Sequence, residues 1–208
     1  MSTGSSKEHV LVLLFLYFSK SFIGRAQLSE ELGIGEGRVR RILLELSQAG
    51  FVEKRRAGVR ISPKGREAVE RTLLSRGVSS FFLSDAQELN ANVAVVAIAR
   101  APRTAPLNVL GMRDDAVRGG AQGAVISVYR NGSLELPPTD INLCVYASNL
   151  CREITRRKSL SENSLIIAVF AYRLADALSG LLSLLYGKHY SELSQDLTTD
   201  GTSETELT

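Results

Sequence analysis

Apolar positions in the first third of the chain recur mainly with helical spacing. The segment Lys7–Lys20 is apolar almost all round, and such a helix must be covered on two sides, by its own chain alone or also by a partner subunit. Ala26–Leu32 predicts a short second helix, and Gly33 follows it where a left-handed residue can close a helix. A third helix, Glu36–Ala49, has one apolar stripe at the spacing i, i+3, i+4, i+7, made of Val39, Ile42, Leu43 and Leu46.

The pattern then changes from helical to alternating. Phe51–Arg56 and Val59–Ser62 alternate on either side of Ala57-Gly58, which predicts a small β-hairpin. The polar segment that begins at Pro63 predicts a surface helix to about Ser75. We expect a first domain over residues 7–78 and a linker over 79–92.

The second half combines apolar strand-like runs with amphipathic helices. The expected strands are 93–99, 124–129, 133–136 and 165–171, with helices at 112–121, 143–157 and 173–186. Asn131-Gly132 is a strong hairpin signal between the second and third strands. The order β-α-β-β-α-β-α is that of a ferredoxin-like sandwich with one added C-terminal helix, although the long loop after the first strand leaves room for another α+β topology. We therefore expect an α+β fold with a second domain over 93–188, followed by a disordered acidic tail over 189–208.

Charge separates the two halves. Residues 1–80 carry 14 Lys and Arg against 8 Asp and Glu, whereas residues 81–208 carry 11 against 14. This asymmetry indicates a basic end that meets a polyanion. The apolar run Val10–Phe18 is far shorter than the roughly 20 residues that span a bilayer, so we expect a cytoplasmic protein that does not enter the membrane.

Cations gather on the third helix and on the hairpin. Arg38, Arg40 and Arg41 lie near the end of the helix that would enter a DNA groove. The hairpin cations suit contacts to the DNA backbone, and a glycine-rich helix start lets a phosphate approach closely. The predicted binding residues for double-stranded DNA are Ser29, Gly35, Gly37, Arg38, Arg40, Arg41, Lys54, Arg55, Arg56 and Arg60.

The stretch LSEELGIGEGRVRRILLELSQAGFVEK, followed by GVRISPKGREA, resembles the winged helix-turn-helix domain of transcription regulators of the MarR-like and iron-dependent-repressor-like groups. The resemblance implies a recognition helix and a wing that bind DNA. The whole chain also resembles an uncharacterised archaeal family that joins such a domain to a C-terminal domain of unknown function. The stretch Arg113–Ala124 carries this second resemblance. Winged helices also bind protein or RNA, so an adaptor role is the alternative.

Several kinds of site have no matching pattern. The chain has only His9 and His189, with no H-x-x-x-H or C-x-x-C, so we expect no metal or other cofactor; His9 would be a helix-start residue and His189 a tail residue. No nucleophile elbow, P-loop or dinucleotide fingerprint occurs, so we expect no enzyme, with an unfamiliar site in the second domain as a third hypothesis. Cys144 and Cys151, if on one helix, lie about 10 Å apart, too far for a disulfide, and are expected to be reduced.

The second domain holds the candidate regulatory features. Arg103, Arg113, Asp114 and Arg118 are candidate ligands of a small anionic effector, and a solvated helix start explains the same charges. The leucines of the last helix are mostly core but also permit a dimer seam, and a two-fold dimer would match a half-site operator. We therefore expect a homodimeric, sequence-specific DNA-binding transcriptional regulator with a C-terminal effector-binding or dimerisation domain.

Overall fold

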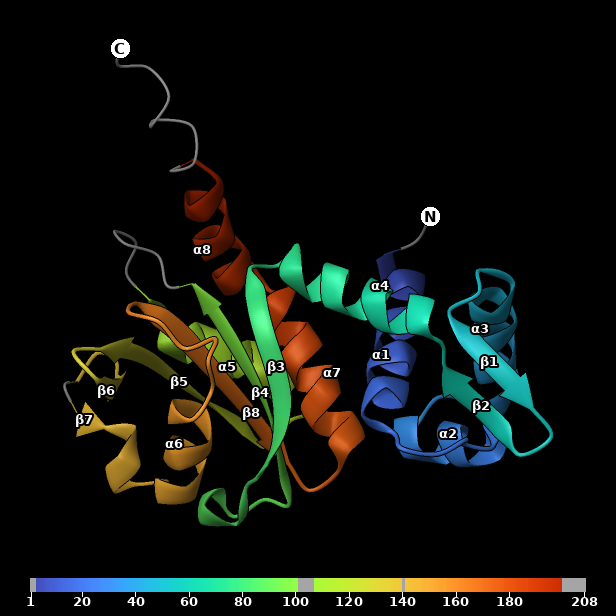
Figure 1. The fold of residues 1–208 in the computed structure, drawn as a ribbon, viewed down its shortest axis with the longest axis horizontal. Helices are drawn as coiled ribbons and strands as arrows, with labels where there is room; N and C mark the ends of the chain where they lie inside the picture. Colours follow the sequence, from blue (N-terminus) through green and yellow to red (C-terminus); the bar gives the residue numbers. More distant parts are fainter. Residues whose placement is uncertain (1–2, 101–106, 140, 200–208) are drawn as a thin grey trace. The chain divides into compact units, whose positions relative to one another are not determined.

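The computed structural model describes residues 3–100, 107–139 and 141–199. The chain divides into two units, Met1–Ser75 and Arg76–Thr208, a few residues earlier than the boundary that the sequence indicated. The first is mainly helical and the second contains a large antiparallel sheet with helices (Figure 1). Among the described residues, no helix is long and apolar enough to cross a membrane.

The first unit contains the predicted helices and hairpin in the predicted order. Its elements are α1 (Thr3–Phe18), α2 (Arg25–Leu32), α3 (Glu36–Gln48), β1 (Val52–Arg55), β2 (Gly58–Ile61) and α4 (Pro63–Leu74). The apolar stripe of α3 is buried as expected, and Leu28 of α2 and Leu73 of α4 are also buried. Gly33 closes α2 with a φ of 63°. Ser62 caps α4 by accepting a hydrogen bond from the Gly65 amide at 3.0 Å, which satisfies a backbone donor of the first turn.

The hairpin is fastened to the segment before α2. Val59 pairs with Ile23 in an isolated antiparallel bridge, and the two residues exchange backbone hydrogen bonds of 2.9 Å. Gly58 makes this approach possible: its φ is +131°, and a Cβ there would lie 2.3 Å from the Ile23 carbonyl oxygen. The structure therefore requires glycine at this position.

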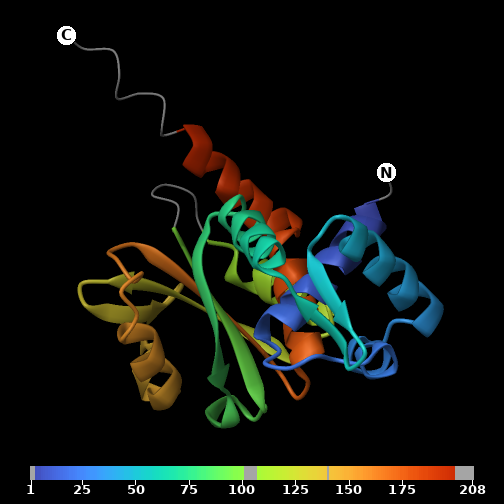
Figure 2. The same ribbon diagram turned by 45° about the vertical axis from the view of Figure 1, so that its right-hand side comes forward.

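The second unit is a three-layered arrangement around one six-stranded sheet. Its strands are β3 (Val78–Asp85), β4 (Val93–Arg100), β5 (Gly123–Arg130), β6 (Ser133–Leu136), β7 (Ile141–Asn142) and β8 (Ser164–Ala171). Helices α5 (Val109–Arg118) and α7 (Leu174–Leu185) pack on one face and α6 (Ser148–Thr155) on the other, as Figures 1 and 2 show. Because both faces of β4 and β8 are covered, nearly every residue of these strands is buried, which explains their continuous apolar runs.

The strand order differs from the ferredoxin-like expectation. The observed order is β3-β4-β8-β5-β6-β7, with antiparallel neighbours throughout. In the ferredoxin-like order the third predicted strand, β6, would lie between the first two, β4 and β5. Here the last strand, β8, lies between them, and β6 pairs with the outer side of β5. The hairpin at Asn131-Gly132 is confirmed, and both of its residues have positive φ.

The expected linker over 79–92 is wrong for most of its length. Residues 78–85 form the edge strand β3, which pairs with β4, and residues 87–89 form the 3-10 helix η1 (Gln87–Leu89). Phe82 of β3 belongs to the core on the α6 face of the sheet. The phenylalanines in this segment are therefore part of the sheet.

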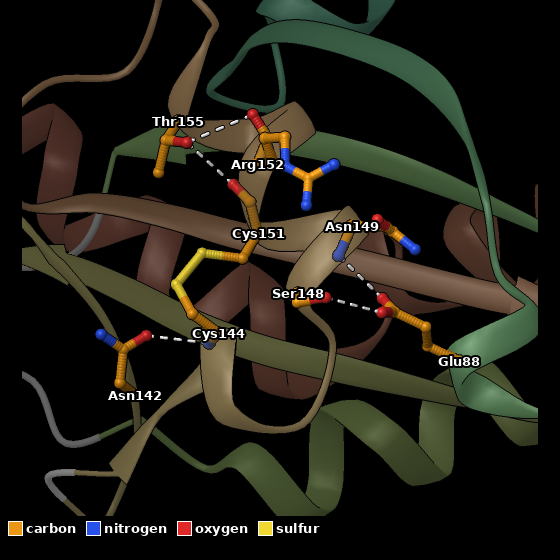
Figure 3. The surroundings of a disulfide bond; sticks show 8 residues. All are labelled: Glu88, Asn142, Cys144, Ser148, Asn149, Cys151, Arg152 and Thr155. Carbon is orange, nitrogen blue, oxygen red and sulfur yellow. Dashed lines mark hydrogen bonds between the residues drawn. A yellow bond between two sulfur atoms is a disulfide. The ribbon is translucent and has the colours of Figure 1, made fainter.

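The two cysteines form a disulfide, which contradicts the expected reduced thiols (Figure 3). The sequence pattern predicts one continuous helix over 143–157, which would keep the two cysteines apart. Instead, a short 3-10 helix, η2 (Leu143–Val145), ends before α6 begins. The turn between them brings the Cα atoms of Cys144 and Cys151 to 5.1 Å, which is within the range for a disulfide.

The start of α6 is capped from another part of the chain. Ser148 Oγ and the Asn149 amide each donate a hydrogen bond of 2.9 Å to the carboxylate of Glu88 in η1 (Figure 3). Desolvation acts to raise the pKa of Glu88, but these bonds, together with those from the Ser148 and Leu150 amides, lower it below its ordinary value. The carboxylate therefore stabilises the first turn of α6 in its ionised form.

The expected disordered tail is also wrong over most of the described part. Residues 188–199 form α8 (Lys188–Thr199), and Tyr190 and Leu193 are buried. His189, expected as a tail residue, lies with Nδ1 2.9 Å from Oδ2 of the buried Asp115 in α5. The Tyr190 hydroxyl donates a 2.6 Å hydrogen bond to the Arg76 carbonyl. Residues 200–208 lie outside the described residues.

Candidate nucleic-acid interface

Helix α3 presents two rows of residues outside its buried stripe. The row that we call the hairpin row, because it faces β1 and β2, consists of Gly37, Arg40 and Leu44. The row that we call the α1 row consists of Arg38, Arg41 and Glu45. Residues three and four apart share one face of a helix, so the two rows have different surroundings.

The α1 row carries its own counter-charges. Arg38 forms an ion pair with Glu8 of α1, and Arg41 forms one of 3.0 Å with Glu45. His9, expected only at a helix start, lies with Nε2 2.7 Å from the same Glu45 carboxylate. Hydrogen bonds from Arg41 and from His9 lower the pKa of Glu45. A DNA phosphate that approached either arginine would therefore meet a carboxylate beside it, which weakens the attraction.

The hairpin row borders a groove between α3 and the hairpin, with a volume of about 440 Å³. Arg40, Lys54 and Arg55 line it, and Arg40 and Lys54 have no acidic partner within the described part of the chain. Arg25 also lines the groove, but it is paired with Glu36 at 2.7 Å. The groove is therefore lined by cations and retains a positive charge that the unit does not neutralise.

The hairpin divides its predicted cations between two faces. Lys54 pairs with Val59 across the strands, whereas Arg60 pairs with Glu53, and adjacent positions on a strand point to opposite faces. Arg60 donates a 2.9 Å hydrogen bond to Glu53, and its guanidinium lies 4.8 Å from the Phe22 ring centroid. Arg60 is thus partnered within the unit, on the face opposite Lys54.

The remaining hairpin cations lie at its tip. Arg55 lines the groove while its guanidinium lies 5.1 Å from the Phe22 ring centroid. Arg56 is exposed in the turn and has no ion pair to the residues that the structure describes. Arg55 follows Lys54 on β1 and shares the Phe22 ring with Arg60, but it lies at the end of the strand, where it also borders the groove. Both side chains at the tip are therefore within reach of a polyanion that lies along the groove.

The predicted residues at the start of α3 have separate roles. The Ser29 hydroxyl donates a 2.6 Å hydrogen bond to the Ile34 carbonyl, so its single proton holds the turn between α2 and α3. A Cβ added at Gly35 or Gly37 would meet nothing within 4 Å, and neither has a positive φ. No side chain caps α3 at its N-cap position. The fold does not need these glycines, and without their side chains the helix start stays open.

Among the described residues, no hydrogen bond or ion pair joins the candidate effector residues to one another. Arg103 lies outside the described residues. Arg113 and Asp114 are exposed on α5, and Arg118 lies 3.2 Å from Asp115 in an i,i+3 ion pair. Asp115 also forms a hydrogen bond with His189, which lies 74 positions later in the chain. No local sequence pattern indicates that pairing.

Five residues that line the groove were absent from the predicted set: Arg25, Leu43, Leu44, Gly58 and Val59. Arg25 lies before the predicted second helix, and no pattern within its own segment points toward the hairpin. Leu44 is 52% exposed although its neighbour Leu43 is buried. The sequence signal that could have indicated Leu44 is its position, because it is a leucine outside the apolar stripe of α3.

In comparisons with known proteins, each unit matches the model of an uncharacterised domain. Residues 6–67 match the family model described as PH0730-like, N-terminal domain, and residues 89–187 match domain of unknown function DUF4443. The solved structure of hypothetical protein PH0730 from Pyrococcus horikoshii OT3 is similar, with a TM-score of 0.66 and 21% identity; the match covers 92% of this chain and 97% of that one. At this identity the likeness shows the fold alone. No curated protein matches the chain.

Proposed function

We propose that this chain is a transcriptional regulator that binds double-stranded DNA through its first unit. In this proposal α2 and α3 form a helix-turn-helix and β1 and β2 form the wing of a winged helix. The observation that carries the proposal is the groove between α3 and the hairpin, where Arg40 and Lys54 have no acidic partner in the described residues. Cations without acidic partners beside an exposed helix favour the binding of a polyanion whose groove is wide enough for that helix.

The two rows of α3 have different roles in this mechanism. The hairpin row enters the major groove, and the hairpin cations Lys54, Arg55 and Arg56 contact phosphates. The open start of α3 at Gly35 and Gly37 faces a phosphate, which the free amides and the helix dipole attract. The α1 row stays outside the contact because its arginines already have carboxylate partners.

We further propose a cytoplasmic homodimer that acts as a regulator rather than as an enzyme. All leucines of α7 except the half-buried Leu174 are buried within the chain, so we place no dimer contact on that stripe. In a two-fold dimer on DNA, the two α3 helices would lie about 34 Å apart, one turn of the duplex. A small anionic effector would act only through different affinities for two arrangements of the dimer.

A pair of neighbouring substitutions tests the proposal. Arg40→Ala and Arg41→Ala each remove one positive charge from an exposed position of α3, but only Arg40 lines the groove. We expect Arg40→Ala to weaken binding to a mixed-sequence DNA duplex by about fivefold or more, and Arg41→Ala by less than about twofold. Fluorescence anisotropy with a labelled duplex at low salt measures both.

An RNA duplex of the same sequence separates DNA binding from the adaptor alternative. The major groove of A-form RNA is too narrow for a helix, so we expect clearly weaker binding to RNA. Equal affinity of the wild type for both duplexes, or equal losses in the two variants, would contradict the proposed use of the groove.

A further inference from the structure

The packing of the first unit does not explain why the apolar side chain of Leu44 is exposed. It is 52% exposed, and the only other large apolar side chain of the described part of that unit with comparable exposure is Leu74, at 63%. Leu74 ends α4 beside the turn between the two units, whereas Leu44 lines the groove with Arg40 and Lys54. An apolar group between cations suits a partner that offers a methyl group beside negative charge.

The spacing within the hairpin row matches the spacing of bases in the major groove. Arg40 and Leu44 lie four residues apart, which is about 6 Å along a helix. Base pairs are stacked about 3.4 Å apart, so the two side chains span about two base-pair steps. In the major groove, guanine offers two acceptors to one arginine, and thymine offers its C5-methyl group to an apolar side chain.

We propose that Leu44 determines sequence specificity by contacting the C5-methyl group of a thymine within about two base pairs of a guanine bound by Arg40. This inference rests on the proposed DNA-binding function and names the feature of DNA that the groove recognises. Uracil lacks this methyl group, so Leu44 also separates DNA from RNA. The contact requires no movement of the buried stripe, because Leu44 lies outside it.

Thymine-to-uracil exchange tests the contact with the full chain. Duplexes that bind the wild type are first selected from a random-sequence pool, and each thymine of the selected site is then replaced singly by deoxyuridine. We expect one replacement to weaken wild-type binding by about fourfold, the effect of one methyl group removed from water. Leu44→Ala should bind the thymine and the deoxyuridine duplex with nearly equal affinity.

Leu74→Ala is the matched control because it shortens a leucine of comparable exposure outside the groove. It should keep the wild-type preference for thymine. If the wild type selects no duplex, the proposed function fails and the inference with it. If the wild type selects a duplex but no thymine replacement changes its affinity, or Leu44→Ala keeps the full preference, the inference alone is overturned.

Discussion

Adjacent residues of α3 have opposite electrostatic surroundings. Arg41 is 81% exposed yet paired with Glu45, whereas Arg40 has no ion pair among the described residues. An exposed ion pair contributes little to stability, but it lowers the charge that a residue offers to a partner. The functional value of a surface arginine here depends on its neighbours as well as on its exposure.

Glycine substitutions separate the requirements of the fold from those of binding. Gly37→Ala should stabilise the protein by up to about 1 kcal/mol, because alanine is the better helix former, and should weaken DNA binding because the new methyl group stands at the open start of α3. Gly58→Ala should destabilise it by about 2 kcal/mol or more, because its Cβ would meet the Ile23 carbonyl. Urea unfolding and duplex binding measure the two effects. A Gly37→Ala protein that binds as tightly as the wild type would show that no phosphate approaches there.

At the scale of elements, local patterns predicted the first unit well. The apolar stripe of α3, Gly33 and the alternation around Gly58 each act over a few residues, and the structure contains the helices and the hairpin that they indicated. The groove could not be predicted in the same way. Which cations line the groove depends on the strand register and on which cations have acidic partners. Glu8 lies 30 residues from its partner Arg38, and Glu53 lies 7 residues from its partner Arg60.

The second unit was predicted less well because its order depends on distant pairs. The position of β8 between β4 and β5 is set by pairing across the sheet, which no local pattern records. The disulfide escaped prediction because a break near Tyr146 separates η2 from α6. Helix α8 was missed because it lies in a polar segment, and within residues 188–193, whose side chains the structure describes, the buried apolar side chains are those of Tyr190 and Leu193.

The docking of α8 gives a prediction at this scale. Burial raises the pKa of Tyr190 to about 12, although the charge of Arg76 acts to lower it. Since the unfolded side chain ionises near pH 10, stability is fully present below that pH and is lost as the pH rises toward 12. The loss should reach about 2–3 kcal/mol.

Tyr190→Phe should remove this alkaline loss and, at neutral pH, cost about 1 kcal/mol for the hydrogen bond to the Arg76 carbonyl. Tyr172→Phe is the control, because Tyr172 is 59% exposed. Denaturant unfolding at a series of pH values compares the three proteins. An alkaline loss that Tyr190→Phe leaves unchanged would mean that Tyr190 is not buried in solution.

For the whole molecule, the basic charge belongs to the first unit and the acidic excess to the second. The two units match two different uncharacterised domains, and the similarity to PH0730 extends over both. The first unit carries the groove and its cations, and the second carries a sheet covered on both faces. We therefore propose that the first unit binds nucleic acid and that the second controls this binding.

The most direct test of DNA binding through the groove is the salt dependence of that binding. Three phosphate contacts, from Lys54, Arg55 and Arg56, predict that the logarithm of affinity falls with the logarithm of salt concentration with a slope of about −3 per protomer. Lys54→Ala should reduce the magnitude of that slope by about 1, whereas Arg71→Ala, a charge loss on α4 outside the groove, should leave it unchanged. A slope near zero, or one that Lys54→Ala and Arg71→Ala change equally, would contradict the account.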